Sequence, residues 1–140
     1  GEIEELVAYG SQHEYPEIDE FSIIFKFKSG FHCSFASSSD ASWLFPFERI
    51  EVFCHHRTII TEEMVRVLDC RGTHADFTTH SFHTFEEDHR RGFLQEDASF
   101  IDCILNGTEP KVTAYDGYKA VELVESVYMA IRTGEKVRFD

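Results

Sequence analysis

The amino-acid sequence predicts an α+β domain, in which an open and mostly antiparallel β-sheet carries helices on one face. The first two-thirds of the chain alternates apolar and polar side chains with the two-residue period of β-strands, and residues 93–133 change to the period of α-helices. The links between the strand-like segments are short, whereas a parallel crossover needs about a dozen residues or more. Strands that precede helices in this way are typical of α+β domains.

The strand-like segments are arranged as hairpins and a meander. The clearest is FSIIFKFK at 21–28, which alternates four apolar side chains with a mixed set that includes Ile24, and Gly30 supplies the turn that follows it. The other expected strands are 3–9, 31–39, 48–55, 57–62 and 64–70, and a short extended piece closes the chain. We expect Ile24 and Phe53 to lie on the sheet face away from the helices, and this open face to form a homo-oligomer, a dimer or tetramer.

Two helices follow the strands. The first ends at Asn106–Gly107, Pro110 prevents its continuation, and Thr113 with Asp116 forms the T-x-x-D capping box of the second. The apolar face of the first helix is expected to hold Phe93, Asp97, Phe100, Ile101, Ile104 and Leu105, and that of the second Ala120, Leu123, Val124, Val127 and Ile131. A charge on the inward face, as in Val124→Asp, is therefore expected to cost several kcal/mol.

Length and composition restrict the class of protein. A chain of 140 residues predicts a single domain, residues 1–140, and its apolar runs are too short to cross a bilayer. The formal net charge of −13 disfavours nucleic acid and anionic membranes as partners. The four cysteines are widely separated and form no CxxC pair, which favours reduced thiols and a cytoplasmic location.

The last forty residues contain an ordered set of motifs: a Phe-led helix, a Gly-x-x-Pro link, an Asp-Gly helix start with Ala three residues later, and a closing Gly-x-x-Val. The residues at these positions are Phe100, Gly107, Pro110, Asp116, Gly117, Ala120, Gly134 and Val137. In these features the segment resembles the C-terminal signature of the Gfo/Idh/MocA family of NAD(P)-dependent oxidoreductases. The hairpins at 19–38 and 48–63 are similar to those of the same family, except that His55 and His56 stand where glycines are usual.

The resemblance implies a dihydrodipicolinate-reductase-like C-terminal domain that binds a sugar, polyol or similar small molecule. This sequence contains no G-x-G-x-x-G turn and no E-K-P stretch, and the family's D-x-x-x-H helix start would fall just before Gly1, so we expect neither the family's Rossmann domain nor its catalytic motifs. We therefore expect the chain to be a substrate-binding and oligomerisation domain. It is expected to bind no cofactor, to contain no catalytic residue and not to transfer hydride alone. NAD or NADP is implied for a full-length enzyme with an N-terminal Rossmann domain.

The resemblance also implies that two loops lean over the nicotinamide site and orient the substrate. The matching loops hold the candidate residues Trp43, Phe45, Phe47, His83, Phe85, His89 and Arg90. An aromatic ring can stack on the C–H surface of a sugar, and His or Arg can hydrogen-bond its hydroxyls or a carboxylate. The alternatives are that Trp43 anchors its own loop and that the histidines are ordinary exposed side chains.

Two other functions stay open at this point. The chain fits a freestanding binding or interaction module that has the same fold and no chemistry. It also fits a small metal enzyme, because residues 72–93 lack clear periodicity and His80 and His83 have the spacing of one helical turn. A loose surface loop rich in His and Glu is the more common structure for such a segment, residues 74–85 also fit a polar strand with alternating aromatic side chains, and we expect no metal.

Overall fold

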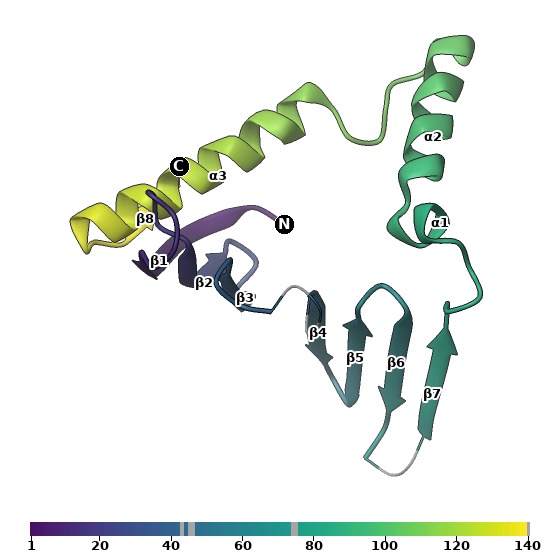
Figure 1. Cartoon of the computed structure of the whole chain (residues 1–140), viewed down its shortest axis with the longest axis horizontal. Coiled ribbons are helices and arrows are strands. Elements are labelled where there is room, and N and C mark those ends of the chain that lie inside the picture. Colours follow the sequence, from purple (N-terminus) through teal and green to yellow (C-terminus); the bar gives the residue numbers. More distant parts are fainter. Residues whose placement is uncertain (43, 45–46, 74–75, 140) are drawn as a thin grey trace. The chain divides into compact units, whose positions relative to one another are not determined.

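The computed structural model describes residues 1–42, 44, 47–73 and 76–139. Its strands and helices are β1 (Ile3–Ser11), β2 (Glu20–Phe27), β3 (His32–Ser38), β4 (Arg49–Cys54), β5 (Arg57–Glu62), β6 (Arg66–Arg71), β7 (Asp76–Ser81), α1 (Glu87–Arg91), α2 (Phe93–Asn106), α3 (Ala114–Thr133) and β8 (Val137–Arg138). The paired strands are antiparallel, which confirms the predicted α+β class (Figure 1).

The strands are divided between two four-stranded sheets, in the orders β3-β2-β1-β8 and β4-β5-β6-β7. Residues 39–48 join β3 to β4, a link longer than the loops of about 2–5 residues that connect hairpins. The chain accordingly splits into two compact units, Gly1–Ala41 with Lys111–Asp140, and Ser42–Pro110. The meander expected as one sheet is therefore two separate ladders, one in each unit.

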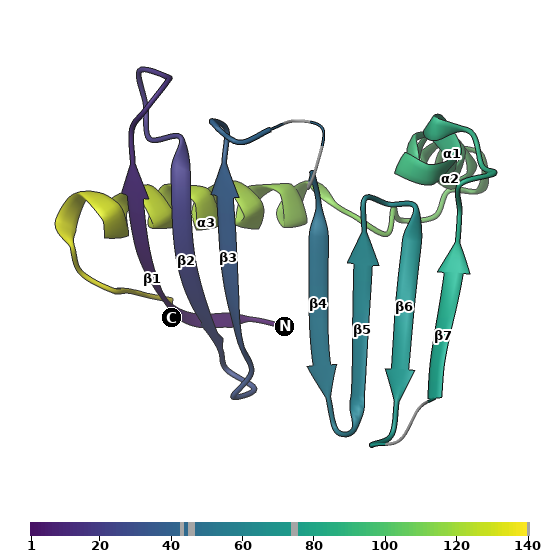
Figure 2. The same ribbon diagram turned by 60° about the horizontal axis from the view of Figure 1, so that its bottom comes forward.

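The core of the first unit lies between its sheet and α3. Leu6 and Ala8 of β1 and Ile23 of β2 are buried against Val127 and Ala130 of the helix. Figure 2 shows α3 running across one face of β1, β2 and β3. Because Ala8 pairs with Ile23 and adjacent residues of a strand point to opposite faces, the expected phase of β2 is confirmed.

The inward face of α3 differs by one position from the predicted face. Val127 is 5% exposed and Ala130 1%, but Val124 is 53% exposed. Leu123 and Ile131 pack beside the core. Successive residues of an α-helix are rotated by 100° about its axis, and the apolar stripe of α3 is wide. The sequence therefore did not determine which part of the stripe faces the sheet. The predicted inward position of Val124 is therefore wrong, and Val127 is the position at which a charge is expected to cost several kcal/mol.

The predicted helix ends are confirmed. The Thr113 hydroxyl accepts a hydrogen bond from the backbone N–H of Asp116, and the Asp116 carboxylate accepts one from the backbone N–H of Thr113 at 2.7 Å, which completes the capping box. Gly107 ends α2 with a φ of 63°, and Gly134 ends α3 with a φ of 71°. Both lie in the left-handed region, which glycine adopts without a steric penalty.

The link between β1 and β2 is organised by Asp19, which is 6% exposed. Its carboxylate accepts hydrogen bonds from the backbone N–H groups of His13, Glu14 and Tyr15 at 2.9, 2.7 and 2.9 Å. The bond from Tyr15 and the other two favour the ionised form, so the pKa of Asp19 is lowered. One aspartate thus replaces the hydrogen bonds that this loop's backbone would otherwise make to water.

The second unit is a four-stranded meander followed by α1 and α2. Its strand β7 lies within residues 74–85, for which a polar strand was one interpretation, and α1 follows that segment. The turn between β4 and β5 contains His55 and His56, and His56 has a φ of 50°. A glycine adopts this left-handed conformation more easily, which is the physical reason for the glycines usual in the related hairpin.

Asp69 is the buried charge of the second sheet, 6% exposed and held by two arginines. Arg57 Nε donates to Oδ1 at 2.7 Å and Arg57 Nη2 to Oδ2 at 2.9 Å, while Arg71 Nη2 donates to Oδ2 at 2.7 Å. The bonds from Arg57, followed by those from Arg71, hold the pKa of Asp69 far below its usual range.

No helix in the described part of the chain is long and apolar enough to cross a membrane.

Candidate functional site

The second unit contains a cavity of about 420 Å³. Its lining residues come from one end of the β4–β6 meander, from the loop that follows β7, and from α1 and the first turn of α2. The apolar wall consists of Ile50, Met64, Val67, Phe82 and Phe85, and the polar groups are Glu48, Thr61, Arg66, His89, Arg90 and Gln95. The Phe82 and Phe85 rings lie 6.1 Å apart, centroid to centroid. A mostly apolar cavity with a few polar groups is the usual form of a small-molecule site.

The turn between β5 and β6 forms one edge of this cavity. Glu63 and Met64 have φ values of 52° and 55°, which residues other than glycine rarely adopt. The turn is held by two hydrogen bonds, from the backbone N–H of Glu63 to the carbonyl of Glu48 and from the backbone N–H of Phe47 to the Glu63 carboxylate, both 2.9 Å. Strained backbone of this kind persists where surrounding contacts fix it, and it is common at ligand sites.

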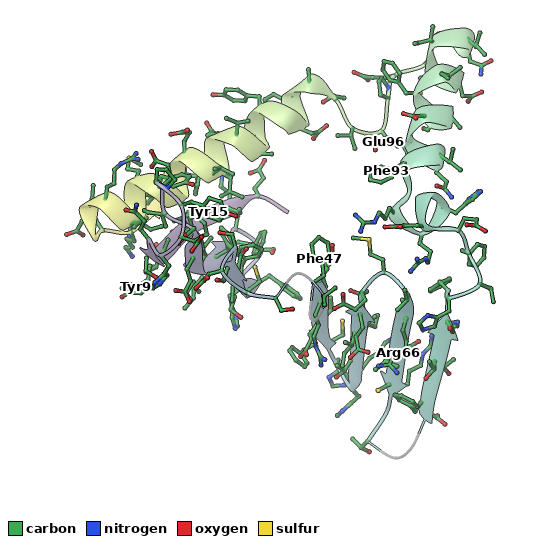
Figure 3. All side chains as sticks on the ribbon, viewed as in Figure 1. Tyr9, Tyr15, Phe47, Arg66, Phe93 and Glu96 are labelled. Carbon is green, nitrogen blue, oxygen red and sulfur yellow. The ribbon has the colours of Figure 1, made fainter. Side chains whose placement is uncertain are left out.

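A second cavity of about 440 Å³ shares Met64 and Arg90 with the first. Its remaining lining residues are Leu44, Phe47, Glu63, Glu87 and Arg91. Arg91 pairs with Glu87 at 2.9 Å, and its guanidinium lies 5.8 Å from the centre of the Phe47 ring. Figure 3 shows Phe47 beside the start of β4. This cation–π contact joins the loop before β4 to α1.

The charges in the first cavity differ in how they are paired. Arg66 donates through Nε to Glu62 at 2.8 Å. His89 Nδ1 lies 3.0 Å from Gln95 Nε2, so in the neutral histidine Nδ1 accepts and Nε2 carries the proton. Arg90 is half-buried and donates through Nε to the carbonyl of Phe85 at 3.2 Å. Within the described ranges, no carboxylate lies at ion-pair distance from Arg90.

The structure places the predicted site residues as follows. Phe85, His89 and Arg90 line the first cavity, and Phe47 lines the second. His83 lines neither of them and is exposed. Trp43 and Phe45 lie outside the described residues.

Sequence reasoning named three of the described residues that line the first cavity and missed the other eight, which are Glu48, Ile50, Thr61, Met64, Arg66, Val67, Phe82 and Gln95. Met64 was assigned to a strand, but it lies in the turn before β6. Positive φ values at both Glu63 and Met64 are typical of a two-residue hairpin turn, but Glu and Met are not the residues that usually indicate such a turn in a sequence. Nothing in the sequence indicates that this turn and α1 share a cavity.

The metal alternative depended on His80 and His83 facing one side of a helical turn. His80 instead lies in β7 and His83 lies beyond the end of that strand, so the two do not share a helical turn. Among the residues that the structure covers, no group of three or more His, Cys, Asp or Glu side chains is placed to hold a metal ion.

Comparisons with known proteins agree with this architecture. The sequence model described as "Oxidoreductase family, C-terminal alpha/beta domain" matches residues 2–139. A levoglucosan dehydrogenase solved with NADH and L-sorbose superposes with a TM-score of 0.85 at 13% identity, over 100% of this chain and 45% of that one. An oxidoreductase from Agrobacterium radiobacter, in complex with NAD+, L-tartaric acid and magnesium, gives 0.81 at 18% identity, over 99% and 44%.

A probable dehydrogenase from Thermotoga maritima gives a TM-score of 0.74 at 26% identity, over 98% of this chain and 43% of that one. The chain therefore spans less than half the length of each of these structures. No curated protein matches the sequence.

Proposed function

Because the chain belongs to the Gfo/Idh/MocA oxidoreductase family, as its C-terminal α/β domain, we propose that it binds the substrate of an NAD(P)-dependent oxidoreductase that acts on a sugar, polyol or similar small molecule. The family match over residues 2–139 carries this proposal, and it leads us to treat residues 1–140 as one domain. The cavity of about 420 Å³ has the size and composition of a small-ligand site. Two of the related structures were solved with L-sorbose and L-tartaric acid, which are both polyhydroxylated.

The nicotinamide cofactor belongs to another part of such an enzyme. A Rossmann domain binds the dinucleotide's pyrophosphate at the Gly-rich turn of a parallel βαβ unit. The strand pairs of the described residues are antiparallel, so these residues do not fit that group. We therefore assign NAD or NADP to an N-terminal Rossmann domain, with this chain orienting the substrate beside it and inactive alone.

Within the cavity, the proposed substrate-binding residues are Phe85, His89 and Arg90. The Phe85 ring offers an apolar surface for sugar C–H groups, while His89 Nε2–H and the Arg90 guanidinium donate hydrogen bonds. Trp43, Phe45 and His83 stay candidates on the matching loops. We infer a cytoplasmic location, which the free thiols at Cys33 and Cys54, both exposed, favour.

The test separates substrate from cofactor binding by the 140-residue protein. Ligand-observed NMR with glycerol and D-glucitol is expected to show contact with the protein, whereas calorimetry with NADH and NADPH is expected to show no saturable heat. Micromolar affinity for either dinucleotide would contradict the assignment of the cofactor to another domain. The alternative, a freestanding binding module, is separated by the coding sequence upstream of Gly1, where G-x-G-x-x-G and E-K-P motifs would establish the enzyme.

We also propose that the open sheet faces form a homo-oligomer. Tyr9 and Ile24, on the face of the first sheet away from α3, are 74% and 58% exposed, and Figure 3 shows Tyr9 on that side. In the second sheet, Phe53 and Phe77 are 66% and 59% exposed and lie in one cross-strand row. Exposed apolar side chains grouped in this way favour an interface.

Light scattering is therefore expected to give a dimer or tetramer. Ile24→Lys, which places a charge on the proposed interface, should shift the mass toward the monomer. Tyr15→Lys is the control, because this side chain is 50% exposed on the loop before β2 and not on the sheet face. A monomeric wild-type protein at high concentration would contradict the interface.

A further inference from the structure

Arg90 stands apart from the other arginines of the second unit. Arg49, Arg57, Arg66, Arg71 and Arg91 each form an ion pair with a carboxylate. The chain has 26 acidic residues and 13 basic ones, so a shortage of carboxylates does not explain why Arg90 has no partner. A half-buried cation without a counter-ion loses hydration that the one hydrogen bond to the Phe85 carbonyl replaces only in part, and an anionic ligand would supply the missing interaction.

The position of Arg90 suits a ligand in the first cavity. Its Nε is fixed by the carbonyl of Phe85 at 3.2 Å, which holds the guanidinium plane. In the part of the chain that the structure describes, its two terminal nitrogens have no hydrogen-bond acceptor. A guanidinium fixed at one nitrogen and unpaired at the other two is prepared to donate two parallel hydrogen bonds to a carboxylate.

The rest of the cavity adds a requirement for hydroxyl groups. Glu48 lines it and forms no ion pair among the described side chains, so its carboxylate can accept hydrogen bonds from ligand hydroxyls. His89 and Gln95 add polar groups beside the Phe82–Phe85 wall. From these contacts we propose that the substrate is a polyhydroxylated carboxylic acid and that Arg90 binds its carboxylate. This proposal rests on the proposed function of the cavity as the substrate site.

A carboxylate fits this site better than a phosphate. Phosphate sites in proteins usually combine several donors, such as clustered basic side chains or the backbone N–H groups of a helix N-terminus. This cavity offers one unpaired guanidinium beside the negative charge of Glu48, in a chain of net charge −13. A monoanion is therefore repelled less than a dianion.

The experiment compares D-gluconate with the neutral D-glucitol and with D-glucose 6-phosphate, titrated into the wild-type protein and followed by NMR. Arg90→Gln is expected to weaken gluconate binding about tenfold or more, the usual effect of losing a charged hydrogen-bond pair. Glucitol affinity should stay unchanged. Arg132→Gln is the matched control, because Arg132 is an exposed arginine of α3 that also has no ion pair with any described carboxylate and lies in the first unit. Arg90→Lys keeps the charge and should give an intermediate loss.

The outcomes distinguish this proposal from the proposed function. If gluconate and glucitol bind alike and neither Arg90 variant changes the affinity, the carboxylate proposal is overturned while substrate binding stands. If glucose 6-phosphate binds more tightly than gluconate and its affinity falls in Arg90→Gln, Arg90 binds phosphates and not carboxylates. The proposal is then overturned. If none of the three compounds binds the wild-type protein, both proposals fail.

Discussion

Replacing Val127 by aspartate is expected to lower the free energy of unfolding by about 3 kcal/mol or more, the largest effect of any change considered. Val127 is 5% exposed and packs against Leu6, Ala8 and Ile23, where an ionised carboxylate would have neither water nor a hydrogen-bond donor. Urea unfolding followed by circular dichroism measures the loss. The same carboxylate at Val124 is the matched control.

Val124 lies one helical turn from Val127 but is 53% exposed, so Val124→Asp should change the unfolding free energy by roughly 0.5 kcal/mol or less. Helix propensity and the number of charges change equally in both variants, and only burial differs. Equal losses in the two variants would show that the face of α3 is assigned wrongly.

Asp69→Asn is expected to give the largest loss in the second sheet. Asparagine keeps the shape of the side chain but removes the negative charge that accepts two hydrogen bonds from the Arg57 guanidinium. It also places an amide N–H donor against one of the Arg57 donors. The melting temperature should fall by several degrees at neutral pH. Glu87→Gln is the control, because Glu87 forms an exposed pair with Arg91 in α1, outside the sheet, where ion pairs contribute little.

The pH dependence gives this prediction a second measurement. The folded-state pKa of Asp69 is lowered, so the ion pairs stabilise the folded protein fully above the pKa of an unfolded aspartate, about 3.9. This stability is lost as the pH falls below that value toward the lower folded pKa. The difference in melting temperature between wild type and Asp69→Asn should be constant from neutral pH to about pH 5 and narrow below pH 4. A difference that grows on acidification would contradict the role of the charge.

Local chemistry in the sequence predicted the elements whose cause is local. Thr113, Asp116 and Gly107 defined the helix ends, because a capping side chain and a positive φ act within a few residues. The alternation in β2 identified Ile23 as a core residue for the same reason. The family resemblance, carried by the spacing of these motifs, was confirmed by the match over residues 2–139.

The features that escaped prediction depend on contacts between distant segments. Whether β3 pairs with β4 depends on the path of the link between them, which alternation does not encode. Val124 and Val127 are alike in the sequence, and only the position of the sheet separates them. The cavity joins Met64 and Glu48 to Arg90 through the fold alone, so Arg90 could be named from a matching loop, but its missing counter-ion could not.

The first unit is assembled from both ends of the sequence, since Leu6 of β1 pairs with Val137 of β8 while Ser42–Pro110 form a unit of their own. During synthesis on the ribosome, β1–β3 therefore emerge long before α3, the helix that covers Leu6 and Ile23. The intervening meander is contiguous and can fold first. Nascent chains stalled before residue 114 should consequently expose the apolar sheet face that α3 later covers. A chaperone that binds this face until translation finishes would protect the protein from aggregation.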